Sequence, residues 1–144
     1  MAYNILIVDD SAPMRAVIKK VVKASGFNSG QIYEASNGKE ALGLLEKEWL
    51  DIVLTDYNMP EMDGLMLLKE MQKHETFKSI PVVMITTEGS KQRVEEFLEK
   101  GAMAYIRKPF SPEEIKDKLN QIMGETSDDV ERESPDVGDE ELDF

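Results

Sequence analysis

Three aspartates each come directly after an apolar segment of the sequence. Asp9 and Asp10 follow the aliphatic run 5–8, and Asp56 follows the segment 51–55. Adjacent carboxylates at the end of a buried segment repel one another and lose solvation, so packing alone does not explain them. Carboxylates without histidine or cysteine nearby are typical of a site for a hard divalent cation with oxygen ligands, above all Mg²⁺.

A hydroxyl group and an ammonium group follow later apolar segments in a similar way. Thr86 lies near the end of the segment 80–87, and Lys108 follows the segment 104–107. A divalent cation, a lysine and a hydroxyl donor together neutralise the charge of a phosphoryl group during its transfer. Asp56 is the expected nucleophile of this set, because it follows the middle one of the strands that carry these groups, and an aspartate can form an acyl phosphate.

These groups are positioned by elements that the hydrophobic pattern predicts. Short apolar runs alternate with stretches whose apolar residues recur at helical spacing. The expected strands cover residues 3–8, 31–35, 51–55, 80–87 and 104–107. The expected helices cover residues 13–25, 39–49, 64–74, 91–100 and 112–123. Trp49 is expected to pack at the end of the second of these helices, and Val94, Phe97 and Leu98 are expected to form the core-facing stripe of the fourth.

The order of these elements predicts the fold class. Strands that are apolar on both faces and separated by helices are typical of a parallel sheet covered on both sides. We therefore expect an α/β protein, a doubly wound (βα)5 sandwich around a five-stranded parallel sheet. In such sheets the ligand site lies beyond the carboxyl ends of the strands. We expect five side chains at that edge of the sheet, those of Asp9, Asp10, Asp56, Thr86 and Lys108.

The composition excludes several classes of site. The chain has 144 residues and no cysteine, so disulfides and thiolate metal sites are excluded, and the single His74 excludes a multi-histidine site within one chain. No secretory signal is visible, and no apolar run approaches the roughly 20 residues needed to span a bilayer. We expect a cytoplasmic protein that does not associate with membranes.

The negative charge is concentrated at the C-terminus. The net charge is −12, and residues 124–144 hold ten acidic residues and one basic residue, a net −9, which leaves −3 for residues 1–123. We expect a folded domain over residues 1–123 and an acidic, disordered tail over 124–144. A chain of this charge is a poor candidate for binding nucleic acid.

Four motifs together identify a family. They are "VDD" (8–10), "LTDYNMPEMDG" (54–64), "ITTE" (85–88) and "YIRKPF" (105–110). In this order and spacing the chain resembles the receiver domain of two-component response regulators, specifically the single-domain chemotaxis type called CheY-like. The resemblance covers about residues 3–123 and implies a flavodoxin-like fold.

The resemblance implies a role for each residue at the acidic edge. Asp56 would be the phosphoacceptor. Asp10 and Asp56 would bind Mg²⁺ through their side chains, the backbone carbonyl of Asn58 would be the third protein ligand, and Asp9 would hold the cation through water.

The resemblance also implies a set of switch residues. Lys108 would pair with Asp56 at rest and with the phosphoryl group afterwards. Thr86 resembles the switch hydroxyl, and Tyr105 resembles the aromatic residue that turns inward when Thr86 moves. The Lys108–Pro109 peptide resembles the cis peptide of the family.

The sequence departs from the family pattern at a few positions near the acceptor. Tyr57 replaces the tryptophan that some members have, and Thr87, beside the switch hydroxyl, is larger than the usual alanine and could alter access to the phosphoryl group. Asn58 and Glu88 occupy positions that tune dephosphorylation in the family. The lifetime of the phosphorylated form therefore does not follow from the sequence.

The function implied by the resemblance is a phosphorylation-dependent signalling switch. A sensor histidine kinase would donate the phosphoryl group, and the chain would catalyse its own phosphorylation and hydrolysis without being an enzyme acting on other substrates. The signal would pass to a protein partner, such as a flagellar motor switch component or a phosphatase, from a monomer or weak dimer. A phosphorelay or a phosphate sink remains an alternative role.

Two other classes of function are compatible with parts of the pattern. A haloacid-dehalogenase-like phosphohydrolase also uses an aspartyl phosphate, but it needs an Asp-x-Asp pair, whereas Asp9 and Asp10 are adjacent. A phosphorylation-independent interaction domain would have no need of the complete set of site residues. The tail is either a solvating extension or a docking segment, because Leu142 and Phe144 lie in its final acidic run, "DEELDF" (139–144).

Overall fold

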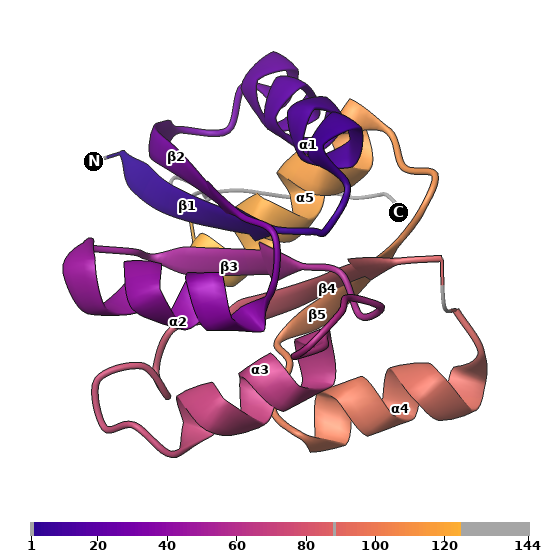
Figure 1. The fold of residues 1–144 in the computed structure, drawn as a ribbon. Helices are drawn as coiled ribbons and strands as arrows, with labels where there is room; N and C mark the ends of the chain where they lie inside the picture. The colour runs from indigo at the N-terminus through magenta and orange to yellow at the C-terminus, as the bar shows by residue number, and fades with distance from the viewer. Residues whose placement is uncertain (1, 88, 125–144) are drawn as a thin grey trace.

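The computed structural model describes residues 2–87 and 89–124, so Glu88 and the expected tail beyond Gly124 lie outside the described residues (Figure 1). Strands and helices alternate from the first element to the last. They are β1 (Tyr3–Val8), α1 (Ala12–Ser25), β2 (Ser29–Ala35), α2 (Gly38–Lys47), β3 (Ile52–Thr55), α3 (Gly64–Gln72), β4 (Val82–Thr86), α4 (Lys91–Glu99), β5 (Ala104–Arg107) and α5 (Pro112–Met123).

The five strands form one parallel sheet in the order β2-β1-β3-β4-β5, which confirms the predicted doubly wound fold. The register places Val8 of β1 opposite Thr55 of β3. The residues that follow, Asp9 and Asp56, therefore leave the sheet side by side. This pairing is what brings two acidic segments from distant parts of the sequence to one edge.

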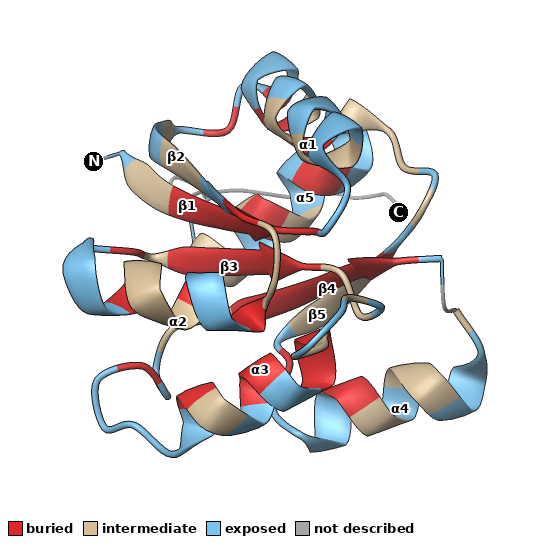
Figure 2. Cartoon of the chain, viewed as in Figure 1, coloured by how far each residue is buried: buried red, intermediate tan, exposed pale blue. Residues whose placement is uncertain are grey.

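The helices cover the sheet in two layers, with α1 and α5 on one face and α2, α3 and α4 on the other (Figure 1). Alternate residues of β1 enter different cores, because successive side chains of a strand point to opposite faces. Ile5 and Ile7 pack in the core under α1 and α5, and Leu6 and Val8 pack in the other. The central strands are buried on both faces (Figure 2).

Local sequence signals define the helix ends near the site. The Ser11 hydroxyl accepts a hydrogen bond from Met14 N at the start of α1. Ser111 and Glu114 form a reciprocal capping box at the start of α5. Such caps satisfy backbone donors that have no partner within the helix. None of the helices in the described part of the chain is long and apolar enough to cross a membrane.

Two expectations about packing were wrong. Trp49 was expected to pack at the end of the second helix, but α2 ends at Lys47 and the Trp49 side chain is 80% exposed. Its backbone carbonyl accepts a hydrogen bond from Asn4 Nδ2, which holds the chain outside the helix as it approaches β3. Leu98 was expected in the core beside Phe97, but Leu98 is 47% exposed while Phe97 is fully buried.

Candidate phosphorylation and metal site

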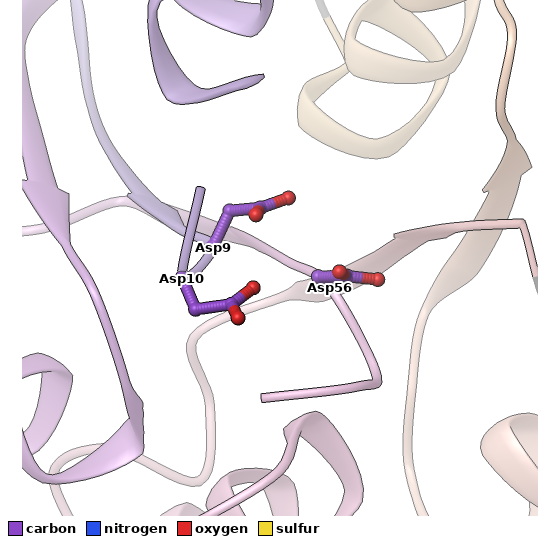
Figure 3. A group of neighbouring side chains, drawn as sticks. All are labelled: Asp9, Asp10 and Asp56. Atoms are coloured by element: carbon purple, nitrogen blue, oxygen red, sulfur yellow. The ribbon is translucent and has the colours of Figure 1, made fainter. Parts of the chain in front are cut away.

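The acidic site begins where β1 and β3 end. The backbone N–H of Asp56 donates to the carbonyl of Val8 at 2.9 Å, and the N–H of Asp9 donates to the carbonyl of Ala35 at 3.1 Å. These bonds continue the parallel ladder by one residue and fix the backbone of both aspartates. Carboxylate oxygens of Asp9, Asp10 and Asp56 consequently lie within 4.8 Å of one another (Figure 3).

The two adjacent aspartates differ in burial. Asp9 is only 2% exposed, and its two carboxylate oxygens accept hydrogen bonds from the Ser11 N–H at 2.9 Å and from Lys108 Nζ at 3.0 Å. Asp10 is exposed. The side chain of Asp9 is therefore held by the protein, whereas Asp10 is accessible to solvent and its carboxylate points toward Asp56 (Figure 3).

Lys108 lies between two carboxylates. Its Nζ is 3.0 Å from Asp9 Oδ2 and 3.5 Å from Asp56 Oδ2, and its side chain is 12% exposed. The expected pairing with Asp56 is present, but the shorter contact is with Asp9. The backbone N–H of Lys108 donates to the carbonyl of Thr86, and the Lys108–Pro109 peptide bond is cis.

Burial raises the pKa of Asp56 above its ordinary value. The positive charge of Lys108 opposes this shift, the negative charge of Asp9 adds to it, and hydrogen bonds from the Tyr57 N–H and the Thr86 hydroxyl oppose it again. Burial costs the ionised form solvation that these contacts do not fully replace. A divalent cation beside Asp56 would favour the ionised form.

The three carboxylates fit the magnesium ion that the sequence predicts. The only cluster of potential metal ligands within residues 2–87 and 89–124 consists of Asp9, Asp10 and Asp56, so all its donors are hard oxygens. Magnesium prefers such donors and usually keeps several waters, which the exposed position of Asp10 permits. Asn58, the expected carbonyl ligand, is also exposed, two residues after Asp56.

The expected switch residues come from the last two strands. Thr86 is fully buried at the end of β4 and is adjacent to Arg107 of β5 in the register. Thr87 is exposed, and Tyr105 is partly buried. A Cβ added to Gly89 would lie 2.5 Å from the Tyr105 hydroxyl oxygen, so this ring reaches the chain just before α4.

The loop after the acceptor closes against Asp56 through Gly64. A Cβ on Gly64 would lie 2.3 Å from the Asp56 carbonyl oxygen, so only glycine fits here without movement of the backbone. The Thr55 hydroxyl donates to the same carbonyl at 2.9 Å. The Gly64 N–H donates to the carbonyl of Tyr57 at 2.9 Å, and Asp63 caps α3.

One residue beside the acceptor was not found from the sequence. The guanidinium of Arg93 in α4 lies 4.7 Å from the centroid of the Tyr57 ring and pairs with Glu96 at 2.6 Å. The spacing of Arg93 and Glu96 indicates an ion pair along a helix, but the contact with Tyr57 joins separate elements and leaves no signal in the pattern.

Comparisons with known proteins identify the family and agree with the fold. The family model described as response regulator receiver domain matches residues 5–120. The chain is 41% identical to a chemotaxis protein CheY homolog of Campylobacter jejuni, and the matched region covers 84% of this chain and 92% of the relative. It is 42% identical to chemotaxis protein CheY1 of Helicobacter pylori, over 84% of this chain and 97% of the relative.

A solved structure shows the same architecture. Chemotaxis protein CheY4 of Vibrio cholerae superposes with a TM-score of 0.76 at 30% sequence identity, over 85% of this chain and 99% of that chain. The resemblance inferred from the four motifs is therefore confirmed. The chain belongs to the response regulator receiver domain family of two-component signal transduction, and its relatives include CheY chemotaxis proteins.

Proposed function

We propose that Asp56 accepts a phosphoryl group from a phosphohistidine of a sensor histidine kinase. A carboxylate oxygen of Asp56 forms a bond to phosphorus while the bond between phosphorus and the histidine nitrogen breaks, and the leaving imidazole takes up a proton. The observation that supports this most directly is the convergence of Asp9, Asp10 and Asp56 with the ammonium of Lys108 at one sheet edge.

The proposed metal ligands are the side chains of Asp10 and Asp56 and the backbone carbonyl of Asn58, with Asp9 acting through water. The bound Mg²⁺ supplies positive charge that neutralises the phosphoryl oxygens during transfer. The difference in burial between Asp9 and Asp10 supports this division of roles, since the Asp9 oxygens already accept hydrogen bonds from Ser11 and Lys108.

Three residues respond to phosphorylation of Asp56, namely Lys108, Thr86 and Tyr105. The Lys108 ammonium lies close enough to Asp56 to move from its carboxylates to a phosphoryl oxygen. The Thr86 hydroxyl, which already hydrogen bonds to Asp56, donates to the phosphoryl group, with Thr87 flanking it. Tyr105 then turns inward, and the equilibrium between two conformations shifts.

The output of this switch is contact with another protein in the cytoplasm, where kinases obtain phosphoryl groups from ATP. The CheY relatives favour a role in chemotaxis, with a flagellar motor component or a phosphatase as the partner. The chain catalyses its own phosphorylation and hydrolysis of the aspartyl phosphate. Phosphorelay and phosphate-sink roles use the same chemistry, with a different recipient of the phosphoryl group.

The test is phosphorylation by a small donor. The full chain is incubated with acetyl phosphate and Mg²⁺ and then analysed by intact mass spectrometry. The expected result is the addition of one phosphoryl group, which is absent in Asp56→Asn and absent when a chelator removes the cation. An unchanged mass of the wild-type chain would contradict the proposal, and multiple turnover of phosphomonoesters would favour a phosphohydrolase instead.

A further inference from the structure

An apolar groove opens between α4, β5 and α5. Its volume is about 500 Å³, and its lining includes Val94, Leu98, Met103, Tyr105, Lys118 and Ile122. Leu98 and Met103 are 47% and 57% exposed, so large apolar side chains at its margin contact solvent. The groove lies beside β5, the outermost strand of the sheet, and within the described residues β5 pairs only with β4. Such a strand has one unpaired backbone edge.

The groove has a single positive charge in its lining. Lys118 is the only charged residue among those that line it. Lys118 takes part in none of the ion pairs found within residues 2–87 and 89–124. A neighbouring hollow that shares Lys118 also has Arg107, Glu114 and Asp117 in its lining, so acidic and basic side chains balance there. In the apolar groove itself Lys118 has no acidic side chain beside it in the lining. An apolar cleft with one free ammonium fits a ligand that has both apolar and acidic side chains.

We infer that this groove is occupied by the C-terminal segment 139–144 of the same chain. That segment reads "DEELDF", with two large apolar residues, Leu142 and Phe144, among acids. Residues two apart lie on the same side of an extended segment, so both can enter the groove together. Asp143 and the acids before Leu142 are then available to Lys118.

The length and origin of the tail support this occupant. The helix α5 ends at Met123, and Ile122 in its last turn already lines the groove. Residues 125–141 span 17 positions between the end of the described chain and Leu142. A random coil of that length would have an end-to-end distance of about 24 Å, and repulsion between the acidic residues would lengthen it, so the segment is long enough to return to its own helix. Tethering at this distance gives an effective concentration in the millimolar range.

The proposed occupant acts as an internal competitor. A millimolar effective concentration lets a segment of weak intrinsic affinity fill the groove in most molecules. Any protein that binds this face has to displace the tail, so its apparent affinity equals its intrinsic affinity multiplied by the fraction of molecules with an open groove. Tyr105 lines the groove, and its rotation would change the fit. That last consequence rests on the proposed function, whereas binding of the tail does not.

The experiment uses the full, unphosphorylated chain and a spin label on the tail. The sequence contains no cysteine, so Gly138→Cys provides a single attachment point for a nitroxide without removing an acidic residue. Amide signals of Val94, Leu98 and Met103 are expected to fall to about half or less of their intensity with the label reduced, since the tail is bound in most molecules. Signals around Trp49, on a separate hollow, serve as the reference.

Two variants make the test specific. Leu142→Ala with Phe144→Ala, carrying the same label, is expected to return the groove signals to the level of the reference signals. Lys118→Glu is expected to reduce the effect, because it places an acid beside the acids of the tail. Unchanged amide positions away from the groove show that each variant is folded. Broadening that is equal in wild type and in the Leu142/Phe144 variant would overturn the proposal.

A mixed sample separates binding within one chain from binding between copies. Spin-labelled chain without isotope is mixed with isotope-labelled chain that lacks the nitroxide. The groove signals of the second chain are expected to stay unchanged. Equal broadening in this mixture would mean that the tail binds a second copy, and broadening centred on Trp49 would mean that it binds another surface; each would overturn the proposal. Neither outcome bears on phosphorylation of Asp56.

Discussion

The guanidinium of Arg93 lies 4.7 Å from the centroid of the Tyr57 ring, and this contact joins α4 to the residue that follows the candidate acceptor. The Tyr57 ring also packs against Phe97 of the same helix, with 5.4 Å between ring centroids. The start of α4 and the acceptor loop therefore share one packed unit. Tyr57 thus forms a direct contact between the acceptor loop and α4 that does not pass through the strands β4 and β5.

We expect a favourable coupling between Arg93 and Tyr57. The cycle comprises Arg93→Ala, Tyr57→Leu and the double variant, with the free energy of unfolding measured by urea denaturation. A cation over a partly exposed ring contributes about 0.5–1 kcal/mol, and the cycle isolates this pair from the contact of Arg93 with Glu96. Strictly additive effects would show that the observed stacking does not stabilise the fold.

Asp10 and Asp9 are expected to differ in how they affect metal binding and stability. Binding of Mg²⁺ to the folded chain raises its free energy of unfolding in proportion to the logarithm of cation concentration. Asp10→Asn should remove most of the increase in the free energy of unfolding that Mg²⁺ causes. Without metal, this variant should be as stable as wild type or more stable, because the substitution relieves the repulsion of Asp10 with Asp9 and Asp56. Asp9→Asn should lower metal-free stability by about 1–3 kcal/mol, since Lys108 loses its closer partner.

The measurement for this pair is urea denaturation with and without Mg²⁺, using the same salt concentration throughout. An equal loss of the magnesium-dependent increase in stability in both variants would contradict the proposal that Asp10 binds the cation directly and Asp9 through water. Asp117→Asn provides a control for removing an acid elsewhere, because Asp117 is exposed on α5, away from the three site carboxylates.

Gly64→Ala is expected to damage the site through the backbone. The added Cβ would meet the Asp56 carbonyl oxygen at 2.3 Å, and a main-chain atom of a buried strand end cannot move aside freely. Overpacking of this kind costs about 1–3 kcal/mol. Phosphorylation by acetyl phosphate should also slow, because the acceptor moves with its carbonyl.

Gly43→Ala is the matched control for this substitution. Gly43 lies within α2 with nothing within 4 Å of an added Cβ, so alanine should stabilise the helix by about 0.5–1 kcal/mol. Both variants are measured by urea denaturation and by the rate of mass gain. A Gly64→Ala chain as stable and as reactive as Gly43→Ala would contradict the close approach seen at Asp56.

The raised pKa of Asp56 predicts a specific dependence of stability on pH in the absence of metal. A carboxyl group whose pKa is higher in the folded state binds its proton more tightly when folded. Its favourable contribution is complete below the unfolded pKa of about 3.9 and is lost as the pH rises through the folded pKa. The free energy of unfolding of Asp56→Asn should therefore increasingly exceed that of wild type as the pH rises from the unfolded pKa through the folded pKa of Asp56.

This dependence is checked by urea denaturation of both chains in chelator from pH 4 to pH 7. Gly43→Ala is the comparison, because it changes no titratable group and should differ from wild type by the same free energy of unfolding at every pH. A constant difference between wild type and Asp56→Asn over the whole range would show that burial does not raise the pKa of Asp56.

The order of the elements and the residues at the ends of the strands follow from the hydrophobic pattern alone. Runs such as 5–8 and 51–55 are apolar on both faces, and that pattern is typical of strands covered by helices on both sides. Parallel strands deliver whatever follows them to one edge. The composition of that edge, with acids after β1 and β3, a hydroxyl at the end of β4 and a lysine after β5, was therefore predictable before any coordinates.

The partner of each side chain and the apolar faces that stay exposed depend on how the elements pack in three dimensions. Lys108 lies closer to Asp9, 99 positions away in the sequence, than to Asp56, because the ends of three strands set those distances together. Helical periodicity places Leu98 on the apolar stripe of its helix, but periodicity does not predict which residues of that stripe are covered by other elements and which stay exposed. The exposed margin of the groove beside β5 depends on how far apart α4 and α5 pack. The hydrophobic pattern along the sequence contains no information about that distance between the two helices.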